Sequence, residues 1–158
     1  MDLLWAPWRI SYIKSSQKNK KCIFCQAKAN PQKNYVFIKN RHSMAMLNIY
    51  PYNNGHSLVF PIRHINKISS LEKDEVWDIY ETVNNTMRLL DKILNPQGYN
   101  LGINLSDIAG AGVKDHLHIH IVPRWKADTN FMPVISNTKV ISQSLKELYK
   151  QLKLISKV

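Results

Sequence analysis

The chain has 158 residues, of which 44% are hydrophobic, 21% charged and 9% aromatic. This length suits one domain, in which folding buries roughly 70% of the surface of the unfolded chain. The composition excludes a disordered, collagen-like or coiled-coil chain. No apolar run approaches the ~20 residues that cross a membrane, and residues 1–10 do not resemble a signal peptide. We therefore expect a cytoplasmic protein that does not associate with membranes.

The net charge of +11 lies mainly at the two ends of the sequence. Residues 1–40 carry +7 and residues 124–158 carry +5, whereas residues 41–123 carry −1. Such an excess raises the question of a polyanionic partner. Several of the lysines lie in a loop rich in Ser, Asn and Gln, and not among aromatic residues on one element. A solvated or phosphate-attracting surface is therefore favoured over a nucleic-acid face.

Three short extended segments come first among the predicted elements, at residues 35–39, 44–49 and 56–62. The sequence Pro51-Tyr52-Asn53-Asn54-Gly55 between the last two has the composition of a turn. These segments are therefore expected to pair as antiparallel strands.

A long helix is predicted next, because Ser69-Ser70-Leu71-Glu72 offers a capping box and apolar residues then recur at helical spacing until Pro96. Extended segments follow at residues 99–104 and 116–122, with a Gly/Ala-rich loop between them. Pro123 is expected to end the second segment. Residues 136–158 are predicted to contain an amphipathic C-terminal helix.

This order of elements predicts a single α+β domain over residues 1–158. A mostly antiparallel sheet of about five strands would pack against one long helix and the C-terminal helix. Residues 1–30 would form an N-terminal arm that contains the only two cysteines, Cys22 and Cys25. The cysteines are too close in sequence to staple distant parts of a fold, so they indicate a metal or redox pair.

Three of the six histidines alternate in His116-Leu117-His118-Ile119-His120. On a strand, alternate side chains point to one face about 6.6 Å apart, so the three imidazoles would line one side while the apolar residues enter the core. Burial and mutual crowding favour neutral rings. Such rings suit metal binding, attack on phosphorus or proton transfer.

The alternating histidines lie downstream of Gly55-His56-Ser57-Leu58-Val59-Phe60-Pro61. This combination resembles the histidine triad (HIT) superfamily of nucleotide hydrolases and transferases. Further segments are similar to its bacterial branch related to diadenosine tetraphosphate phosphorylases. They are Trp5-Ala6-Pro7-Trp8-Arg9, the Cys22/Cys25 pair, Ala109-Gly110-Ala111-Gly112, Pro123-Arg124-Trp125, and residues 128–134. The resemblance covers residues 5–150 and implies a HIT-like fold.

The resemblance implies catalytic roles for three histidines. His118 matches the nucleophile, which attacks the α-phosphorus of a nucleotide and holds the nucleotidyl group until water or phosphate accepts it. His120 and His56 match positions that hydrogen-bond phosphate oxygens and support the nucleophile. Asn48 matches the position that binds the ribose hydroxyls.

The loop that contains Asn104, Gly110 and Gly112 is the expected phosphate cradle, because glycines let backbone N–H groups approach an anion closely. The loop departs from the nucleoside phosphoramidate hydrolases of the superfamily. Those enzymes carry Gln and then Ser or Thr where Ala111 and Gly112 stand here. This departure favours the phosphorylase-like branch.

The resemblance also implies a structural zinc site. In family members that keep both cysteines, the other two ligands are the histidine of a Pro-x-x-His segment and the first histidine of the triad. These match His64 and His116, which would complete a Cys2His2 site with Cys22 and Cys25. Four protein ligands leave no open position, so the zinc would be structural and not catalytic.

The expected protein is thus a homodimeric nucleotidyl hydrolase or transferase with structural Zn2+. Its substrate would be a purine nucleotide or a dinucleoside polyphosphate similar to diadenosine tetraphosphate, with phosphate or water as the acceptor. Two alternatives stay open: a catalytically idle nucleotide-binding sensor, and a zinc-stabilised protein that binds nucleic acid. The intact triad counts against the first, and the distribution of charge counts against the second.

Overall fold

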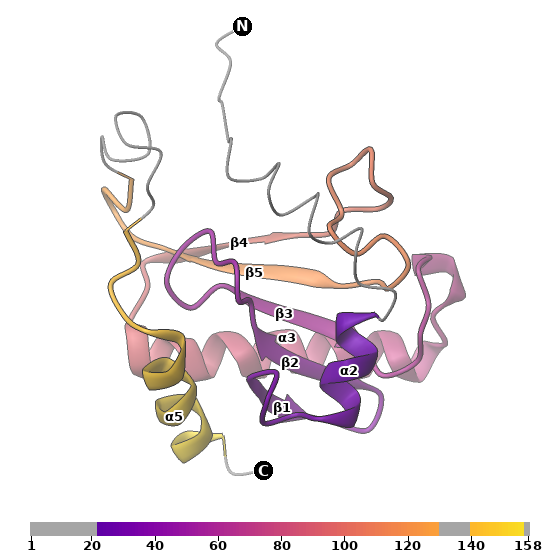
Figure 1. The fold of residues 1–158 in the computed structure, drawn as a ribbon, viewed down its shortest axis with the longest axis horizontal. Coiled ribbons are helices and arrows are strands. Elements are labelled where there is room, and N and C mark those ends of the chain that lie inside the picture. Colours follow the sequence, from indigo (N-terminus) through magenta and orange to yellow (C-terminus); the bar gives the residue numbers. More distant parts are fainter. Residues whose placement is uncertain (1–21, 130–139, 157–158) are drawn as a thin grey trace, which may run out of the picture.

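Five antiparallel strands form one sheet in this computed structural model, which describes residues 22–129 and 140–156. The strands are β1 (Val36–Lys39), β2 (Ser43–Leu47), β3 (Ser57–Pro61), β4 (Gly98–Gly102) and β5 (Ile119–Arg124). Their order across the sheet is β1-β2-β3-β5-β4, so the last strand in sequence lies between β3 and β4 (Figure 1). All four pairs are antiparallel, which confirms the predicted α+β architecture.

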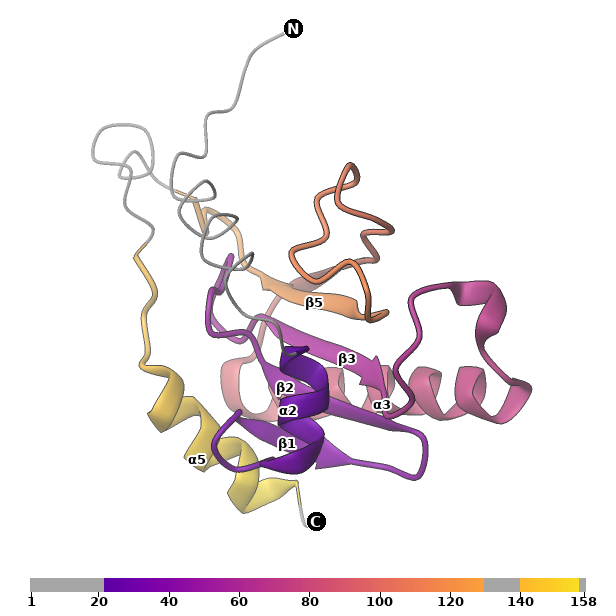
Figure 2. The same ribbon diagram turned by 45° about the vertical axis from the view of Figure 1, so that its right-hand side comes forward.

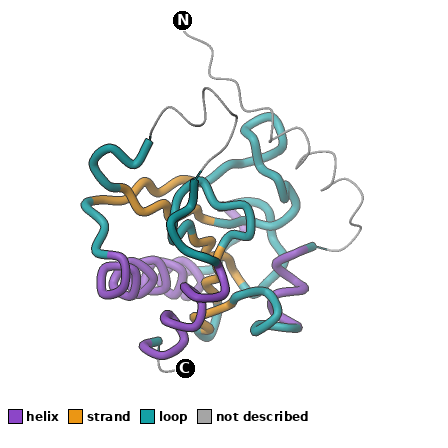
Figure 3. The backbone as a smooth tube through the Cα atoms, turned by 60° about the vertical axis from the view of Figure 1, so that its left-hand side comes forward, coloured by secondary structure: helices purple, strands orange, loops and turns teal. Residues whose placement is uncertain are grey.

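Helices cover both faces of this sheet. The long helix α3 (Lys73–Leu94) runs behind one face, and the short helix α2 (Ile23–Ala29) lies across the other (Figures 1 and 2). The C-terminal helix α5 (Leu145–Ile155) packs against α3 and β1. Figure 3 shows these two longer helices below the strands and the long connecting loops above them. Within the described residues, no helix is both long and apolar enough to cross a membrane.

Two hydrophobic clusters lie on opposite faces of the sheet. All residues of β2 and β3 are buried because both faces of these strands are covered. Neighbouring residues of β2 therefore enter different clusters. Ala45 packs with Leu90 of α3 on one side, while Met44 packs with Phe60 and Phe24 of α2 on the other.

The helix after β3 begins later than its sequence predicted. Ser69 and Ser70 form a 3₁₀ turn, η1 (Ile68–Ser70), and the next residue is extended. The capping box uses Glu72 and Glu75, and the Glu75 carboxylate accepts a hydrogen bond from the Glu72 N–H at 2.9 Å. The predicted box at Ser69 was wrong because Arg63 binds the Ser70 carbonyl at 2.7 Å and holds this turn outside the helix.

The strand that follows the glycine loop is shifted toward the C-terminus relative to its prediction. It begins at Ile119, so His116 and His118 stand before it, and it continues through Pro123 to Arg124. Proline fits here because β3 pairs with β5 only as far as Ile121. Beyond that residue β5 has one partner, β4, and the missing N–H of Pro123 breaks no ladder on the β3 side.

Two other boundaries differ from expectation. Helix α2 lies where only an arm with two cysteines was predicted, and α5 begins at Leu145, well inside the predicted range 136–158. Ser144 caps α5 by accepting a hydrogen bond from the Glu147 N–H. The motif at residues 5–9 and the segment 131–134 lie outside the described residues.

Candidate functional site

The three alternating histidines have different neighbours. His116 and His118 are buried just before β5, with 1% and 4% of their surfaces exposed, and His120 lies on β5. The rings of His118 and His120 are adjacent, with centroids 5.0 Å apart. His116 instead lies beside the two cysteines.

The position of the proton on His118 follows from its hydrogen bond. Its Nδ1 lies 2.9 Å from the carbonyl oxygen of His116, which can only accept. Nδ1 therefore carries the proton, and Nε2 of the neutral ring keeps a lone pair. Burial lowers the pKa of His118, although the hydrogen bond to the His116 carbonyl opposes this. The ring of Phe24 packs on it at a centroid distance of 4.9 Å.

His56 and His120 form a direct hydrogen-bonded pair. Nδ1 of His56 accepts from the backbone N–H of Tyr52 at 3.0 Å, so its proton lies on Nε2. That Nε2 lies 2.9 Å from Nδ1 of His120 and donates to it. In a neutral ring the proton of His120 then lies on Nε2. Burial and the neighbouring His120 and His118 lower the pKa of His56 to about 3.

Asn48 lies at the same end of the site, immediately after β2. Its Oδ1 accepts from the N–H of Tyr50 at 2.9 Å, which orients the side-chain amide. The Nδ2 group then faces Nδ1 of His56 at 3.3 Å. The structure therefore brings the predicted residues Asn48, His56, His118 and His120 together.

A cavity of about 430 Å³ opens beside His120. The predicted residue Asn104 lines it. The remaining lining residues are Tyr52, Asn53, Asn100, Leu101, Gly102, Val122, Arg124, Asp128 and Thr129. Asn104 donates to the carbonyl of Gly110 at 3.4 Å, and Gly110 has a φ of +89°. Among the described residues that line this cavity, neither Gly110 nor Gly112 is present.

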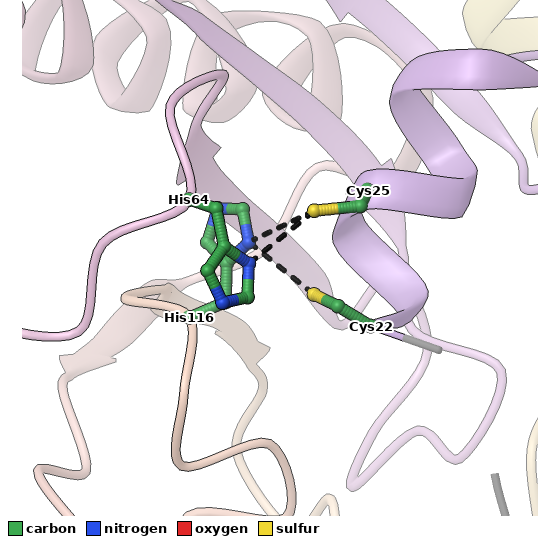
Figure 4. Close-up of side chains that lie close together, drawn as sticks. All are labelled: Cys22, Cys25, His64 and His116. Atoms are coloured by element: carbon green, nitrogen blue, oxygen red, sulfur yellow. Dashed lines mark hydrogen bonds between the residues drawn. The ribbon is translucent and has the colours of Figure 1, made fainter. Parts of the chain in front are cut away.

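Four potential metal ligands meet on the other side of His116. Cys22 and Cys25 come from the start of α2, and their side chains point toward His64 and His116 (Figure 4). Nδ1 of His116 lies 3.3 Å from the Sγ atom of Cys22, and Nδ1 of His64 lies 3.3 Å from that of Cys25. All four ligand atoms lie within 4.8 Å of one another.

The residues present fit a tetrahedral zinc ion. Usual Zn–S and Zn–N bond lengths place sulfur and nitrogen ligands about 3.5 Å apart. Here three S···N separations are 3.3, 3.3 and 3.9 Å. Nε2 of His116 donates to the carbonyl of Pro61 at 2.8 Å, so its Nδ1 lone pair faces the cysteines. A hydrogen bond from the ring nitrogen that does not bind the metal is typical of a histidine ligand.

Several residues of the site were missed from the sequence. Phe24 packs against both the metal cluster and the nucleophile candidate, because its ring contacts His116 and His118. Tyr52 stacks on His120 with 15° between the rings. The available signals were weak: Phe24 stands between the two cysteines, and Tyr52 stands in a segment with turn composition.

Fold and site together define a protein with a hydrogen-bonded His56–His120 pair, a cavity that His120 lines, and four potential metal ligands that include His116. The family model of the HIT domain matches residues 29–127. The chain therefore belongs to the HIT domain family.

Individual relatives agree with this assignment. An AP-4-A phosphorylase of Mycobacterium tuberculosis is 31% identical over 93% of this chain and 80% of its own length. An asymmetrical bis(5'-nucleosyl)-tetraphosphatase of Schizosaccharomyces pombe is 34% identical over 62% of this chain and 53% of its own. A zinc-bound histidine triad family protein of Mycobacterium smegmatis shares the fold, with a TM-score of 0.68, 21% identity, and coverage of 90% and 95% of the two chains.

Proposed function

We propose that this protein transfers a nucleotidyl group from a dinucleoside polyphosphate, such as diadenosine tetraphosphate, through a covalent intermediate on His118. One observation carries the proposal. The hydrogen bond from His118 Nδ1 to the His116 carbonyl leaves Nε2 with its lone pair, in a ring whose lowered pKa keeps it neutral at pH 7. A neutral imidazole held in this tautomer is a nucleophile without prior deprotonation.

The first step exchanges one bond to phosphorus for another. Nε2 of His118 attacks the α-phosphorus, a P–N bond forms, and the P–O bond to the leaving nucleotide breaks with its electron pair. The ring then carries positive charge, and the carbonyl of His116 stabilises it through the proton that stays on Nδ1. In the second step an oxygen of water or inorganic phosphate attacks phosphorus, the P–N bond breaks with its electron pair returning to Nε2, and any proton on the attacking oxygen is released to solvent.

His120 and His56 act on the phosphate oxygens in this proposal. The proton on Nε2 of His120 supplies a donor to an oxygen that gains charge in the transition state. His56 supports it by donating to His120 Nδ1 at 2.9 Å. The low pKa of His56 keeps it a neutral donor at Nε2 over the physiological range.

Substrate binding involves the cavity beside His120 and the loop after β4. We assign Asn48 to the ribose, and Asn104, Gly110 and Gly112 to the phosphates. Gly110 supports this because its left-handed backbone is the conformation that forms anion-binding nests of N–H groups. The volume of about 430 Å³ lies within the usual range for small-molecule sites.

Cys22, Cys25, His64 and His116 would hold a zinc ion with a structural role, since all four ligands are protein side chains. Bound zinc would fix the segment before β5 in place, and with it the carbonyl of His116. We also propose that the protein acts in the cytoplasm, and that it is a homodimer, as the family resemblance implies.

The proposal is tested by incubating the protein with diadenosine tetraphosphate, with and without inorganic phosphate, and identifying the products. ADP and ATP formed only with phosphate indicate phosphorolysis, whereas AMP and ATP formed without it indicate hydrolysis. The His118→Asn variant should form neither. Absence of turnover by the wild-type protein, with cleavage of an adenosine phosphoramidate in its place, would contradict the proposed substrate.

A further inference from the structure

The turn between β2 and β3 touches both histidines of the His56–His120 pair. The N–H of Tyr52 donates to Nδ1 of His56 at 3.0 Å. The ring centroid of Tyr52 lies 4.6 Å from that of His56. The Tyr52 ring also stacks on His120, with the centroids 5.9 Å apart. One residue of the turn thus contacts the pair through its backbone and through its side chain.

Two donors face Nδ1 of His56, the Tyr52 N–H at 3.0 Å and the more distant Nδ2 of Asn48 at 3.3 Å, and the shorter backbone contact is the stronger constraint on the tautomers of both rings. A backbone N–H only donates, so His56 accepts at Nδ1 and keeps its proton on Nε2. That proton is shared with Nδ1 of His120, which must then keep its own proton on Nε2. If the Tyr52 N–H moved away, only the longer contact from Nδ2 of Asn48 would still hold Nδ1 of His56 as an acceptor, and the opposite arrangement would become more accessible. His120 would then present a lone pair at Nε2 and would repel a phosphate oxygen.

A buried side chain next to Tyr52 anchors the turn to the end of β5. The Nδ2 group of Asn53, a residue only 9% exposed, donates to the carbonyl of Pro123 at 3.0 Å and to Asp128 at 2.8 Å. The Asp128 carboxylate, 8% exposed, is in turn held by Nε and Nη2 of Arg124 at 2.6 and 2.9 Å. Such charge-assisted bonds are among the strongest that a protein forms.

The other end of the turn is fixed by packing. Gly55 has a φ of +76°, and a Cβ there would lie 2.5 Å from Cδ1 of Leu94 and 3.1 Å from Cγ of Pro123. The backbone therefore lies directly against α3 and β5. Since the N–H of His56 also donates to the Asn53 carbonyl at 3.1 Å, the turn has little freedom to move relative to the histidine.

We propose that Asn53 and Asp128 are positioning residues: they hold the Tyr52 amide against His56 and so set the tautomers of His56 and His120. The inference rests on the proposed function for its effect on turnover. The tautomers themselves can be observed without any substrate.

The test compares wild-type protein with Asn53→Ala, using long-range ¹H–¹⁵N NMR spectra of the histidine rings and the kinetics of diadenosine tetraphosphate turnover. Wild-type His56 and His120 should both carry the proton on Nε2. In Asn53→Ala both rings should show a mixture of tautomers. Its kcat should fall roughly 10- to 100-fold, the scale of a misplaced catalytic group, while KM changes less than about threefold.

Two further variants make the comparison specific. Asp128→Asn keeps an oxygen for Asn53 but weakens the pair with Arg124, so it should shift the tautomers in the same direction by a smaller amount; it also serves if Asn53→Ala does not fold. Gln97→Ala is the matched control. Gln97 stands just before β4, and its side chain accepts from the Lys126 N–H, just after β5, at 2.6 Å; its loss should leave the spectra and kcat unchanged.

The outcomes separate this inference from the proposed function. A proton on Nδ1 of His56 in the wild-type protein would overturn the inference, as would wild-type spectra and kcat in the folded Asn53→Ala protein. If the wild-type protein does not turn over the substrate but the variants shift the tautomers as expected, the positioning role is supported and the proposed function fails.

Discussion

The buried histidines of this site differ in which ring nitrogen keeps its proton, and each difference has a specific partner. His118 donates from Nδ1 to a carbonyl, whereas His56 accepts at Nδ1 from an N–H. His116 donates from Nε2 to Pro61, which leaves Nδ1 for the metal cluster. In the proposed mechanism, identical side chains would thus serve as a nucleophile, a supporting donor and a metal ligand, according to the hydrogen-bond partner of each ring.

The depressed pKa of His56 predicts a pH dependence of stability. Its pKa is about 3 in the folded protein, against 6.5 in the unfolded chain. Between these values the unfolded chain binds more protons, so the free energy of unfolding should fall as the pH decreases below about 6.5. Urea unfolding of wild-type and His56→Gln proteins between pH 6 and 4 measures the effect. Wild type should lose up to roughly 1 kcal/mol more per pH unit than the variant, and equal slopes would contradict the buried neutral ring.

At this scale the identities of the site residues could be predicted, but their tautomers could not. The alternation of His116, His118 and His120 is visible in sequence, and family motifs add His56 and Asn48. The partners that set the protons are backbone groups, and only the fold brings each of them to a particular ring nitrogen. Only the folded chain shows that the Tyr52 N–H meets Nδ1 of His56.

At the scale of elements, the short helix α2 could not be predicted because its signals are tertiary. It has seven residues and no side-chain cap, and helices of that length are marginal without packing. Phe24 and Ala27 are buried against the sheet, with 1% and 0% of their surfaces exposed. The helix is therefore stabilised by the same contacts that place the two cysteines beside His116.

The predicted boundaries of the longer elements were wrong for a related reason. The sequence predicted the cap at Ser69, but the bond from Arg63 to the Ser70 carbonyl holds that turn outside the helix, and Glu72 is the N-cap. Pro123 predicted the end of a strand. The strand continues because β5 pairs only with β4 at this position, so the proline disturbs no pairing with β3.

The β2–β3 turn yields a prediction about Gly55. The Gly55→Ala variant should lose about 2–3 kcal/mol of stability, because an alanine is strained at φ +76° and its Cβ would overlap Leu94. Gly98→Ala is the control, since a Cβ at this position of β4 meets nothing within 4 Å. It should change stability by less than about 1 kcal/mol. Denaturant unfolding measures both, and equal losses would show that the turn is not tightly packed.

At the scale of the whole molecule, the Cys2His2 cluster joins three separate parts of the chain: α2, the segment after β3, and the segment before β5. The order of strands could not be deduced from sequence, because the position of β5 between β3 and β4 depends on contacts between residues far apart in sequence. This insertion brings His120 next to His56, which stands immediately before β3. The site is thus assembled from residues 64 positions apart in sequence.

The cluster predicts that the purified protein holds about one zinc ion per chain. Because the ligands are not assembled in the unfolded chain, metal binding contributes to folding. A chelator should lower the free energy of unfolding, by roughly 4 kcal/mol when free zinc was a thousandfold above its Kd. The Cys25→Ser variant should contain less metal and respond less to the chelator. A metal-free protein of unchanged stability would refute the site.

The most direct measurement is intact-protein mass spectrometry, with peptide mapping, of protein quenched during turnover of diadenosine tetraphosphate. We expect an adenylyl adduct on the peptide that contains His118. The adduct should be labile to acid, as a P–N bond is, and absent from His118→Asn. An adduct that persists in the variant, or turnover of unmodified wild-type protein with no adduct under any quench condition, would contradict His118 as the nucleophile.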